Sequence, residues 1–233
     1  MVTRSSAAIV LIYHSYRDPL FQNLMLGYLR TLVKSQGVRF YLITFEQEHF
    51  ELSVKEVRRE KKMLRQNGIL WYPIPYHTGR FIVASKIVDL FQAIFLIGKL
   101  RHLTKAKLLV TFTNLSASIG IICAQLFRLK MLIYCYEPHS DFLVELGIWR
   151  KGSFKHRISR LIEFYAGRRA DFVMASTKYV VDLLTDFKLR GRLVRAPVSV
   201  DEKAFTFKRK GRERVRKEYR LHNRNVVLYL GKF

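Results

Sequence analysis

The chain alternates short apolar runs with longer stretches of helical periodicity. The apolar runs occupy residues 8–13, 39–45, 69–74, 107–112, 131–136, 171–175 and 192–195. Most of them are apolar at consecutive positions and do not alternate with polar residues, a pattern typical of strands covered on both faces. Helical patterns fill the intervals at 20–35, 52–67, 81–103, 116–129, 154–169 and 178–187. This order predicts an α/β fold with a Rossmann-like parallel sheet and helices on both faces.

One predicted helix, 81–103, is unusually apolar. Its polar residues Ser85, Lys86, Asp89 and Gln92 share one narrow stripe. A spanning helix needs about 20 mostly apolar residues, and charges interrupt this one. We therefore expect burial against the sheet with the polar stripe facing water; the alternative is a helix lying in a membrane interface.

The composition adds a strong positive charge to this picture. The 233 residues include 42 Lys and Arg against 18 Asp and Glu, a formal net charge of +24. Such a charge suits nucleic acid, an anionic lipid surface or phosphorylated substrates. The N-terminus shows no A-x-A cleavage pattern, so we expect a cytoplasmic chain.

Common catalytic motifs are absent from the sequence. Neither G-x-G-x-x-G, a P-loop, G-x-S-x-G, H-E-x-x-H nor a paired metal-ligand spacing occurs. In open parallel sheets, ligands bind beyond the carboxyl ends of the strands, so the loops that follow the strands hold the candidate chemistry.

Two of these loops are rich in polar residues. After the first strand, His14 and Arg17 could contact a phosphate or a sugar hydroxyl, or Asp18 could simply cap the next helix. After the fifth strand, carboxylates and a histidine suit sugar hydroxyls and proton transfer near pH 7. These residues are Glu137, His139, Asp141 and Glu145. The alternative is a helix cap at Ser140 or Asp141.

A basic segment with interleaved apolar residues follows. It suits a membrane-surface helix, in which each cation contributes about 1 kcal/mol near an anionic leaflet. Its predicted membrane contacts are Trp149, Arg150, Lys151, Lys155 and Arg157. RNA binding and a merely solvated helix remain alternatives, although the sequence has no RRM, KH or helix-turn-helix pattern. We expect no nucleic-acid partner.

Three motifs near the C-terminus carry a family resemblance. They are Ala170-Asp-Phe-Val-Met-Ala-Ser176, Pro197-Val-Ser-Val-Asp-Glu-Lys-Ala-Phe205 and the run 225–232. In this order the chain resembles the N-terminal half of a GT-B glycosyltransferase, most similar to glycosyltransferase family 4. Two departures from that pattern are Ser15-Tyr-Arg-Asp-Pro19 in place of Gly-Gly, and Pro197-Val-Ser199 in place of Pro-Asn-Gly.

The resemblance implies a domain plan and a reaction. Residues 1–205 would form the acceptor-binding domain, 206–224 a basic linker, and 225–233 the first strand of a truncated donor-binding domain. Sugar would pass from a nucleotide-sugar donor to a lipid-linked or polysaccharide acceptor in cell-surface glycan biosynthesis. The resemblance implies that the reaction retains the configuration of the sugar. His139 and Glu137 would be catalytic, with Gly231 and Lys232 on the donor side.

The resemblance also implies no cofactor, no metal and no activity of this chain alone, because the donor-binding carboxylates would lie beyond Phe233. The expected location is the inner face of the plasma membrane, as a peripheral protein. Two alternatives stay open: an acceptor-binding, membrane-recruiting subunit that needs a donor-binding partner, and a basic RNA-binding protein.

Overall fold

The computed structural model describes the chain except for residues 1–5, 79–81, 135–138, 186–188, 198–205 and 229–233. It divides into two compact units, Met1–Ser199 and Val200–Phe233. The second unit contains helix α9 (Arg209–Glu218), which has no buried residue. The predicted division at residue 205 and the roles assigned to both parts stay predictions.

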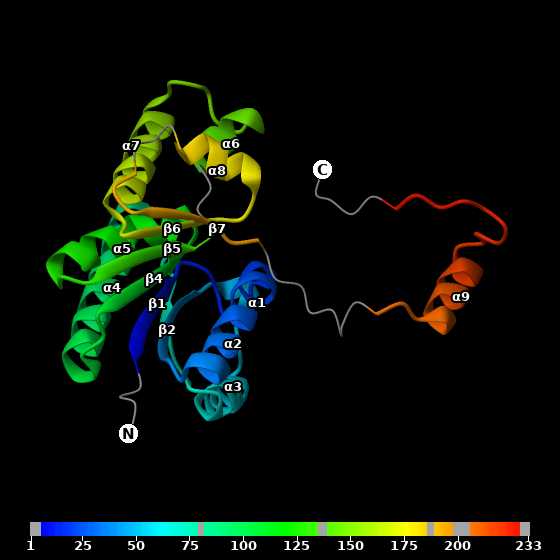
Figure 1. The fold of residues 1–233 in the computed structure, drawn as a ribbon, viewed down its shortest axis with the longest axis horizontal. Coiled ribbons are helices and arrows are strands. Elements are labelled where there is room, and N and C mark those ends of the chain that lie inside the picture. Colours follow the sequence, from blue (N-terminus) through cyan, green and yellow to red (C-terminus); the bar gives the residue numbers. More distant parts are fainter. Residues whose placement is uncertain (1–5, 79–81, 135–138, 186–188, 198–205, 229–233) are drawn as a thin grey trace. The chain divides into compact units, whose positions relative to one another are not determined.

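The first unit is built on one parallel sheet of seven strands. Their order is β3-β2-β1-β4-β5-β6-β7. The strands are β1 (Ala7–Ile12), β2 (Arg39–Glu46), β3 (Ile69–Pro75), β4 (Leu108–Phe112), β5 (Lys130–Tyr134), β6 (Phe172–Ala175) and β7 (Arg192–Arg195). Each strand predicted between residues 8 and 195 is present, and the predicted α/β Rossmann-like class is confirmed (Figure 1).

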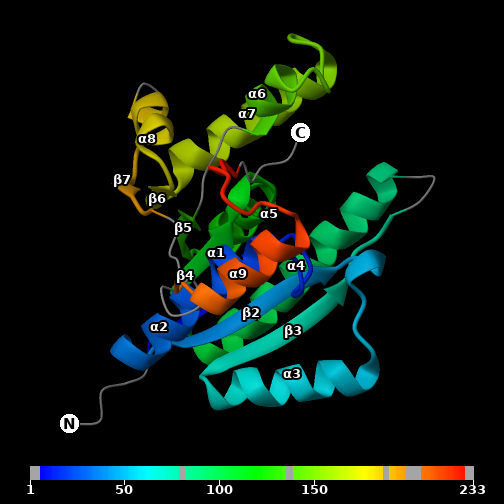
Figure 2. The same cartoon turned by 90° about the vertical axis from the view of Figure 1, so that its right-hand side faces the viewer.

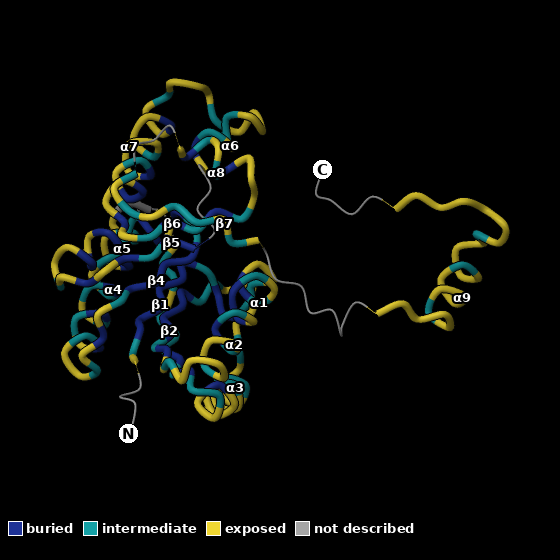
Figure 3. The backbone as a smooth tube through the Cα atoms, viewed as in Figure 1, coloured by how far each residue is buried: buried dark blue, intermediate teal, exposed yellow. Residues whose placement is uncertain are grey.

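Helices cover both faces of this sheet, as Figures 1 and 3 show. One face is packed by α1 (Pro19–Leu24), α2 (Leu26–Gln36) and α3 (Val54–Gln66). The other is packed by α4 (Ile82–Thr104), α5 (Thr113–Leu126), α7 (Phe154–Arg169) and α8 (Lys178–Thr185). Burial on both faces explains why the strands carry apolar residues at consecutive positions.

Local signals set the ends of several elements. Asp18 caps α1, and Ser53 with Glu56 forms a capping box at α3. Gly37 ends α2 in the left-handed conformation, with φ 63°. The short 3₁₀ helix η1 (Glu48–Phe50) links β2 to α3.

The structure corrects four expectations. The helix expected at 20–35 is two helices, divided at Met25, whose buried side chain belongs to the core. The loop expected after β5 contains helix α6 (His139–Glu145). The expected linker 206–224 contains α9. Residues 225–228 of the expected strand lie outside any strand, and the rest of that run is not described.

Candidate functional site

The centre of the sheet holds a topological switch point. The chain winds outward from β1 through β2 to β3 and then returns to β4 on the other side of β1. Ile12 is in register with Phe112, so the loop after β1 and the start of α5 leave the sheet side by side. Ligands of open α/β sheets bind in such a crevice.

The loop after β1 places His14 at this crevice. Its Nδ1 lies 3.0 Å from Asp18 Oδ2, and its ring meets the ring of Phe112 edge-on at 6.4 Å. Asp18 Oδ1 also accepts from the backbone N–H of Leu20 at 2.8 Å, so this residue performs the helix capping that the sequence allowed. Because Nδ1 faces Asp18, Nε2 is the ring nitrogen directed to other partners.

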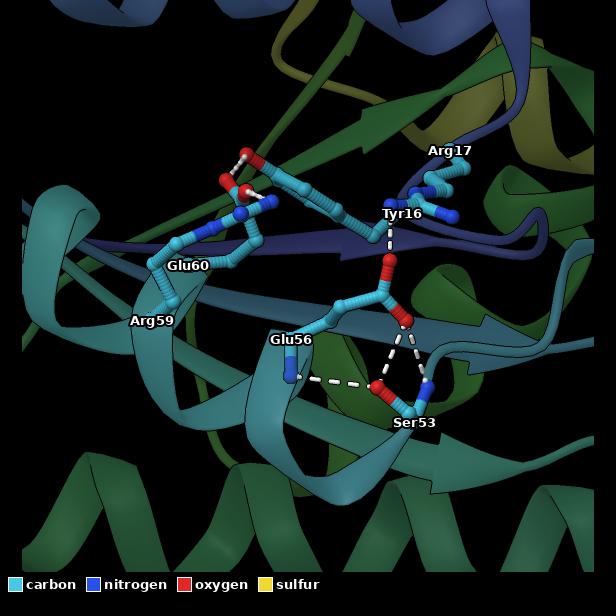
Figure 4. A network of polar contacts seen from close by, with 6 residues as sticks. All are labelled: Tyr16, Arg17, Ser53, Glu56, Arg59 and Glu60. Atoms are coloured by element: carbon cyan, nitrogen blue, oxygen red, sulfur yellow. Dashed lines mark hydrogen bonds and ion pairs between the residues drawn. The ribbon is translucent and has the colours of Figure 1, made fainter.

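Arg17 from the same loop reaches α3 (Figure 4). Its Nη2 lies 2.8 Å from Glu56 Oε1 in an exposed ion pair. Hydrogen bonds from the side chain and backbone of Ser53, followed by that from Arg17, lower the pKa of Glu56 to about 2. Arg17, which the sequence predicts to contact the sugar acceptor, is therefore already paired with a carboxylate.

The neighbouring residues of this network fix the loop further. The hydroxyl of Tyr16 donates to Glu60 at 3.1 Å, and Arg59 pairs with the same carboxylate at 3.3 Å (Figure 4). Burial raises the pKa of Tyr16 to about 12, so its phenol stays protonated and continues to donate.

The junction of β4 and α5 contains a strained residue that the sequence did not reveal. Thr113 begins α5 with φ 65°, a left-handed conformation that a β-branched residue rarely adopts. Within the described part of the chain its Oγ1 is buried without a hydrogen-bond partner. Strain of this kind clusters at functional sites, so Thr113 joins the candidate site.

Glu163 of α7 connects three elements beneath the crevice. One oxygen of its buried carboxylate accepts from the backbone N–H of Ser140 at 3.0 Å, and the other from the Ser140 hydroxyl at 2.6 Å. The side chain of Asn114, which follows Thr113 on α5, also bonds to it. Burial raises the pKa of Glu163 despite these bonds. The carboxylate thereby holds the first turn of α6 in place.

The residues predicted after β5 come together on this short helix. His139 is its exposed first residue, with its ring 6.4 Å from that of Phe142. Asp141 Oδ1 lies 3.0 Å from His156 Nε2, and its Oδ2 lies 3.4 Å from Arg160 Nε. Glu145 is exposed at the last turn. Predicted residues Glu137, Gly231 and Lys232 lie outside the described residues.

A second polar cluster lies under the carboxyl edge of β1 and β3. Asp89 of α4 has no exposed surface and accepts from Tyr13 Oη at 2.6 Å and His77 Nδ1 at 2.7 Å. Lys86 Nζ lies 3.3 Å from the same carboxylate and 3.4 Å from the ring centre of Tyr76. Burial alone would raise the Asp89 pKa, but these hydrogen bonds and the lysine charge together lower it.

This cluster corrects the expectation for α4. The polar stripe does not face water, because Asp89 points into the protein. The opposite face is apolar and exposed: Phe91 is 64% exposed and Phe95 74%. In the described part of the chain, no helix is both long and apolar enough to cross a membrane.

The predicted membrane contacts surround the start of α7. Trp149 is half-buried, whereas the four cations are exposed: Arg150, Lys151, Lys155 and Arg157. A stripe of exposed apolar side chains runs along the same helix at helical spacing. We call it the α7 stripe: Phe154, Ile158, Leu161 and Tyr165.

No three His, Cys, Asp or Glu side chains of the described residues gather into a group that could hold a metal ion. Metal independence and the absence of a cofactor stay predictions.

Comparison with known proteins gives matches at the level of structure. No family model matches the sequence. No curated protein matches it either. Anabaena HepE, solved with UDP, superposes with a TM-score of 0.57 at 11% identity, covering 94% of this chain and 50% of HepE.

Two further structures show the same relation. Sucrose-phosphate synthase from Thermosynechococcus elongatus gives a TM-score of 0.60 at 14% identity, covering 91% of this chain and 52% of the synthase. UGT2 of Phytolacca americana, solved with UDP-2fluoro-glucose and pterostilbene, gives a TM-score of 0.59 at 7% identity, covering 88% of this chain and 56% of UGT2. The chain spans about half the length of these structures. At such identities the likeness establishes the fold, and the chain shares the Rossmann-like architecture of GT-B glycosyltransferases.

Proposed function

We propose that this chain is the acceptor-side part of a glycosyltransferase similar to family 4. It would transfer sugar from a nucleotide-sugar donor to a lipid-linked or polysaccharide acceptor in cell-surface glycan biosynthesis. The observation that carries the proposal is the crevice between β1 and β4 in a fold shared with UDP-bound HepE. Because the chain spans about half of HepE, the donor site would belong to a part outside these residues, and this chain would be inactive alone.

The crevice offers the groups that sugar transfer needs on the acceptor side. His14 is oriented by Asp18, and the turn containing His139 is held by Glu163 through Ser140. Imidazole and carboxylate groups can bind hydroxyls and move protons near neutral pH. His139 and Glu137 are the proposed catalytic residues; His14, Arg17, Asp141 and Glu145 are the proposed acceptor contacts. A retaining, metal-independent reaction is part of the proposal.

The test compares His139→Ala with His102→Ala in the full product of the gene. His102 is an exposed histidine in the last turn of α4, which precedes the amino end of β4, whereas the crevice lies at the carboxyl ends of the strands. Transfer of labelled sugar from UDP-sugars to a lipid extract should fall about 100-fold or more in His139→Ala, the scale of a lost acid-base group. Equal transfer by both variants would remove His139 from the site.

Membrane attachment is the second part of the proposal, on the inner face of the plasma membrane. Two exposed apolar surfaces favour it, the outward face of α4 and the α7 stripe, and the basic segment that includes Arg150 and Lys155 adjoins the latter. Apolar side chains flanked by cations are what an interfacial helix requires.

Vesicle flotation tests this attachment with charge-matched variants. Serine at Arg150, Lys151, Lys155 and Arg157 should release the protein from anionic vesicles. Serine at four exposed cations of α3 should leave it bound, although the net charge falls equally. These control positions are Lys55, Arg58, Lys61 and Lys62. Equal retention of both variants would place the membrane surface elsewhere.

A further inference from the structure

A large groove crosses the sheet face that α4, α5 and α7 cover. Its volume is about 970 Å³, within the range of sites that hold whole ligands. Figures 1 and 2 show α5 lying between α4 and α7. The lining is mostly aliphatic and aromatic, and its apolar residues include Leu90, Leu115, Ile119, Ile122, Ile162 and Tyr165.

The two ends of the groove differ in chemistry. Tyr13 and Tyr76, which follow β1 and β3, close the end at the carboxyl edge of the sheet. The other end lies at the amino edge and is lined by Arg168 and Arg169, which end α7 just before β6, and by Arg190, just before β7. Lys86 also lines the tyrosine end, but its ammonium is paired with the carboxylate of Asp89. The groove is therefore mostly apolar along its length, and among the described residues the lining cations without a carboxylate partner lie at the arginine end.

These three arginines are placed to bind an anion. The guanidinium of Arg168 lies 5.2 Å from the ring centre of Phe164, and that of Arg169 lies 5.4 Å from the ring centre of Tyr165. Among the described residues, no carboxylate forms an ion pair with Arg168, Arg169 or Arg190. A guanidinium matches the oxygens of a phosphate with paired hydrogen bonds.

The polar atoms of the apolar part are already satisfied. The hydroxyl of Tyr165 bonds to Gln125 at 2.9 Å, and that of Ser118 donates to the carbonyl of Asn114 at 2.9 Å. A peptide would bring backbone N–H and C=O groups into this apolar part, where they would lose their water without gaining partners. A hydrocarbon chain carries no such cost.

We infer that the groove binds one anionic phospholipid of the bilayer, with a hydrocarbon chain along α5 and the phosphate at Arg168, Arg169 and Arg190. The exposed apolar faces of α4 and α7 belong to two of the helices that wall the groove, which gives a lipid a path from the membrane. The phosphate end lies at the amino edge of the sheet, away from the crevice. The lipid is thus distinct from the sugar acceptor, and its binding does not depend on the proposed transfer reaction.

The experiment uses a short-chain lipid that stays monomeric, so that groove binding is separated from adsorption to a vesicle surface. Diheptanoyl phosphatidylglycerol is titrated below its micelle concentration into the 233-residue chain and followed by calorimetry. We expect saturable binding with one lipid per chain. Diheptanoyl phosphatidylcholine should bind at least about tenfold more weakly, because its cationic choline group opposes the arginines.

Two variants locate the site. Serine at Arg168, Arg169 and Arg190 should weaken phosphatidylglycerol binding at least about tenfold, the effect of losing charged hydrogen bonds. Ser118→Trp, which fills the apolar part, should weaken both lipids. The matched control, serine at the exposed α3 cations Lys55, Arg58 and Lys61, should bind the monomeric lipid normally although it removes the same charge.

Several results would overturn the inference. They are no saturable binding by the wild type, equal affinity for the two headgroups, or wild-type affinity in both groove variants. Circular dichroism of each variant shows whether a loss of binding reflects the groove or misfolding. The two variants change different parts of the groove, because the three arginines lie at the surface and Ser118 lies in the apolar part. If only one variant misfolds, the other still decides.

Discussion

The buried carboxylate of Asp89 gives the sharpest test of the structure. Replacing it by alanine removes the acceptor for the Tyr13 hydroxyl and His77, and leaves the Lys86 ammonium without its ion pair. Removing one member of a buried ionic cluster costs about 3–5 kcal/mol. For a chain of this size, that loss lowers the unfolding temperature by roughly 6–20 °C.

Asn at this position separates charge from shape. Asp89→Asn keeps one oxygen acceptor but places an NH₂ group against one of the groups that donate to the carboxylate. We therefore expect a loss of stability smaller than that of Asp89→Ala. The folded-state pKa of Asp89 is below its ordinary value, so its stabilising contribution is present above the ordinary carboxyl range. That contribution is lost as pH falls through the folded pKa, and the Asn variant should show a flatter acid dependence.

Urea unfolding at several pH values measures both effects. The control is Asp182→Ala, an exposed aspartate of α8 whose loss should change stability by less than about 0.5 kcal/mol. A loss under about 1 kcal/mol in Asp89→Ala would show that the cluster does not fasten α4 to the sheet. An unchanged acid slope in Asp89→Asn would contradict the lowered pKa.

Two further predictions concern the stability of the first unit, at Glu56 and at Gly191, with Gly211 of α9 as a control position. Because the pKa of Glu56 is lowered from 4.5 to about 2, its contribution is present above pH 4.5 and lost as pH falls toward 2. Glu56→Gln should lose that part of the acid dependence in urea midpoints, and superimposable pH profiles would contradict the Ser53 and Arg17 contacts. An added Cβ at Gly191 would lie 2.2 Å from a backbone carbonyl oxygen, so Gly191→Ala should cost about 1–3 kcal/mol by thermal unfolding. Gly211→Ala, in the open helix α9, should not destabilise, and equal losses at both glycines would disprove the close approach.

Much of the sheet could be predicted from the sequence because each strand is covered on both faces and therefore apolar throughout. The helices were harder. The apolar pattern of 20–35 runs on through Met25, so nothing in the sequence marks the division between α1 and α2. Helix α6 is only seven residues long and is fastened by Glu163, a tertiary contact that local pattern does not show. Helix α9 was not predicted, because its run of charged residues contains too few apolar positions to show a helical period.

The candidate site was predicted in part. The polar loops after β1 and β5 stood out because polar residues follow buried strands at the edge where ligands bind. Thr113, Asp89 and Glu163 were missed, since their roles depend on a backbone angle or on partners distant in sequence. Tyr13 and Asp89, for example, are 76 positions apart. The available signal for Asp89 is a charged residue within an apolar helix, but the sequence pattern alone favours a solvent-facing position for it.

The register between β1 and β4 has a consequence for synthesis of the chain. Ala8 pairs with Leu108, so the most buried strand cannot complete its hydrogen bonds until about 100 further residues have been made. At ribosomal rates of about 5–20 residues per second, that interval lasts on the order of 5–20 s. During it, an apolar strand edge is available to other chains. The centre of the fold is therefore also its point of greatest exposure to aggregation, and chaperone dependence should be sought in nascent chains that end before β4.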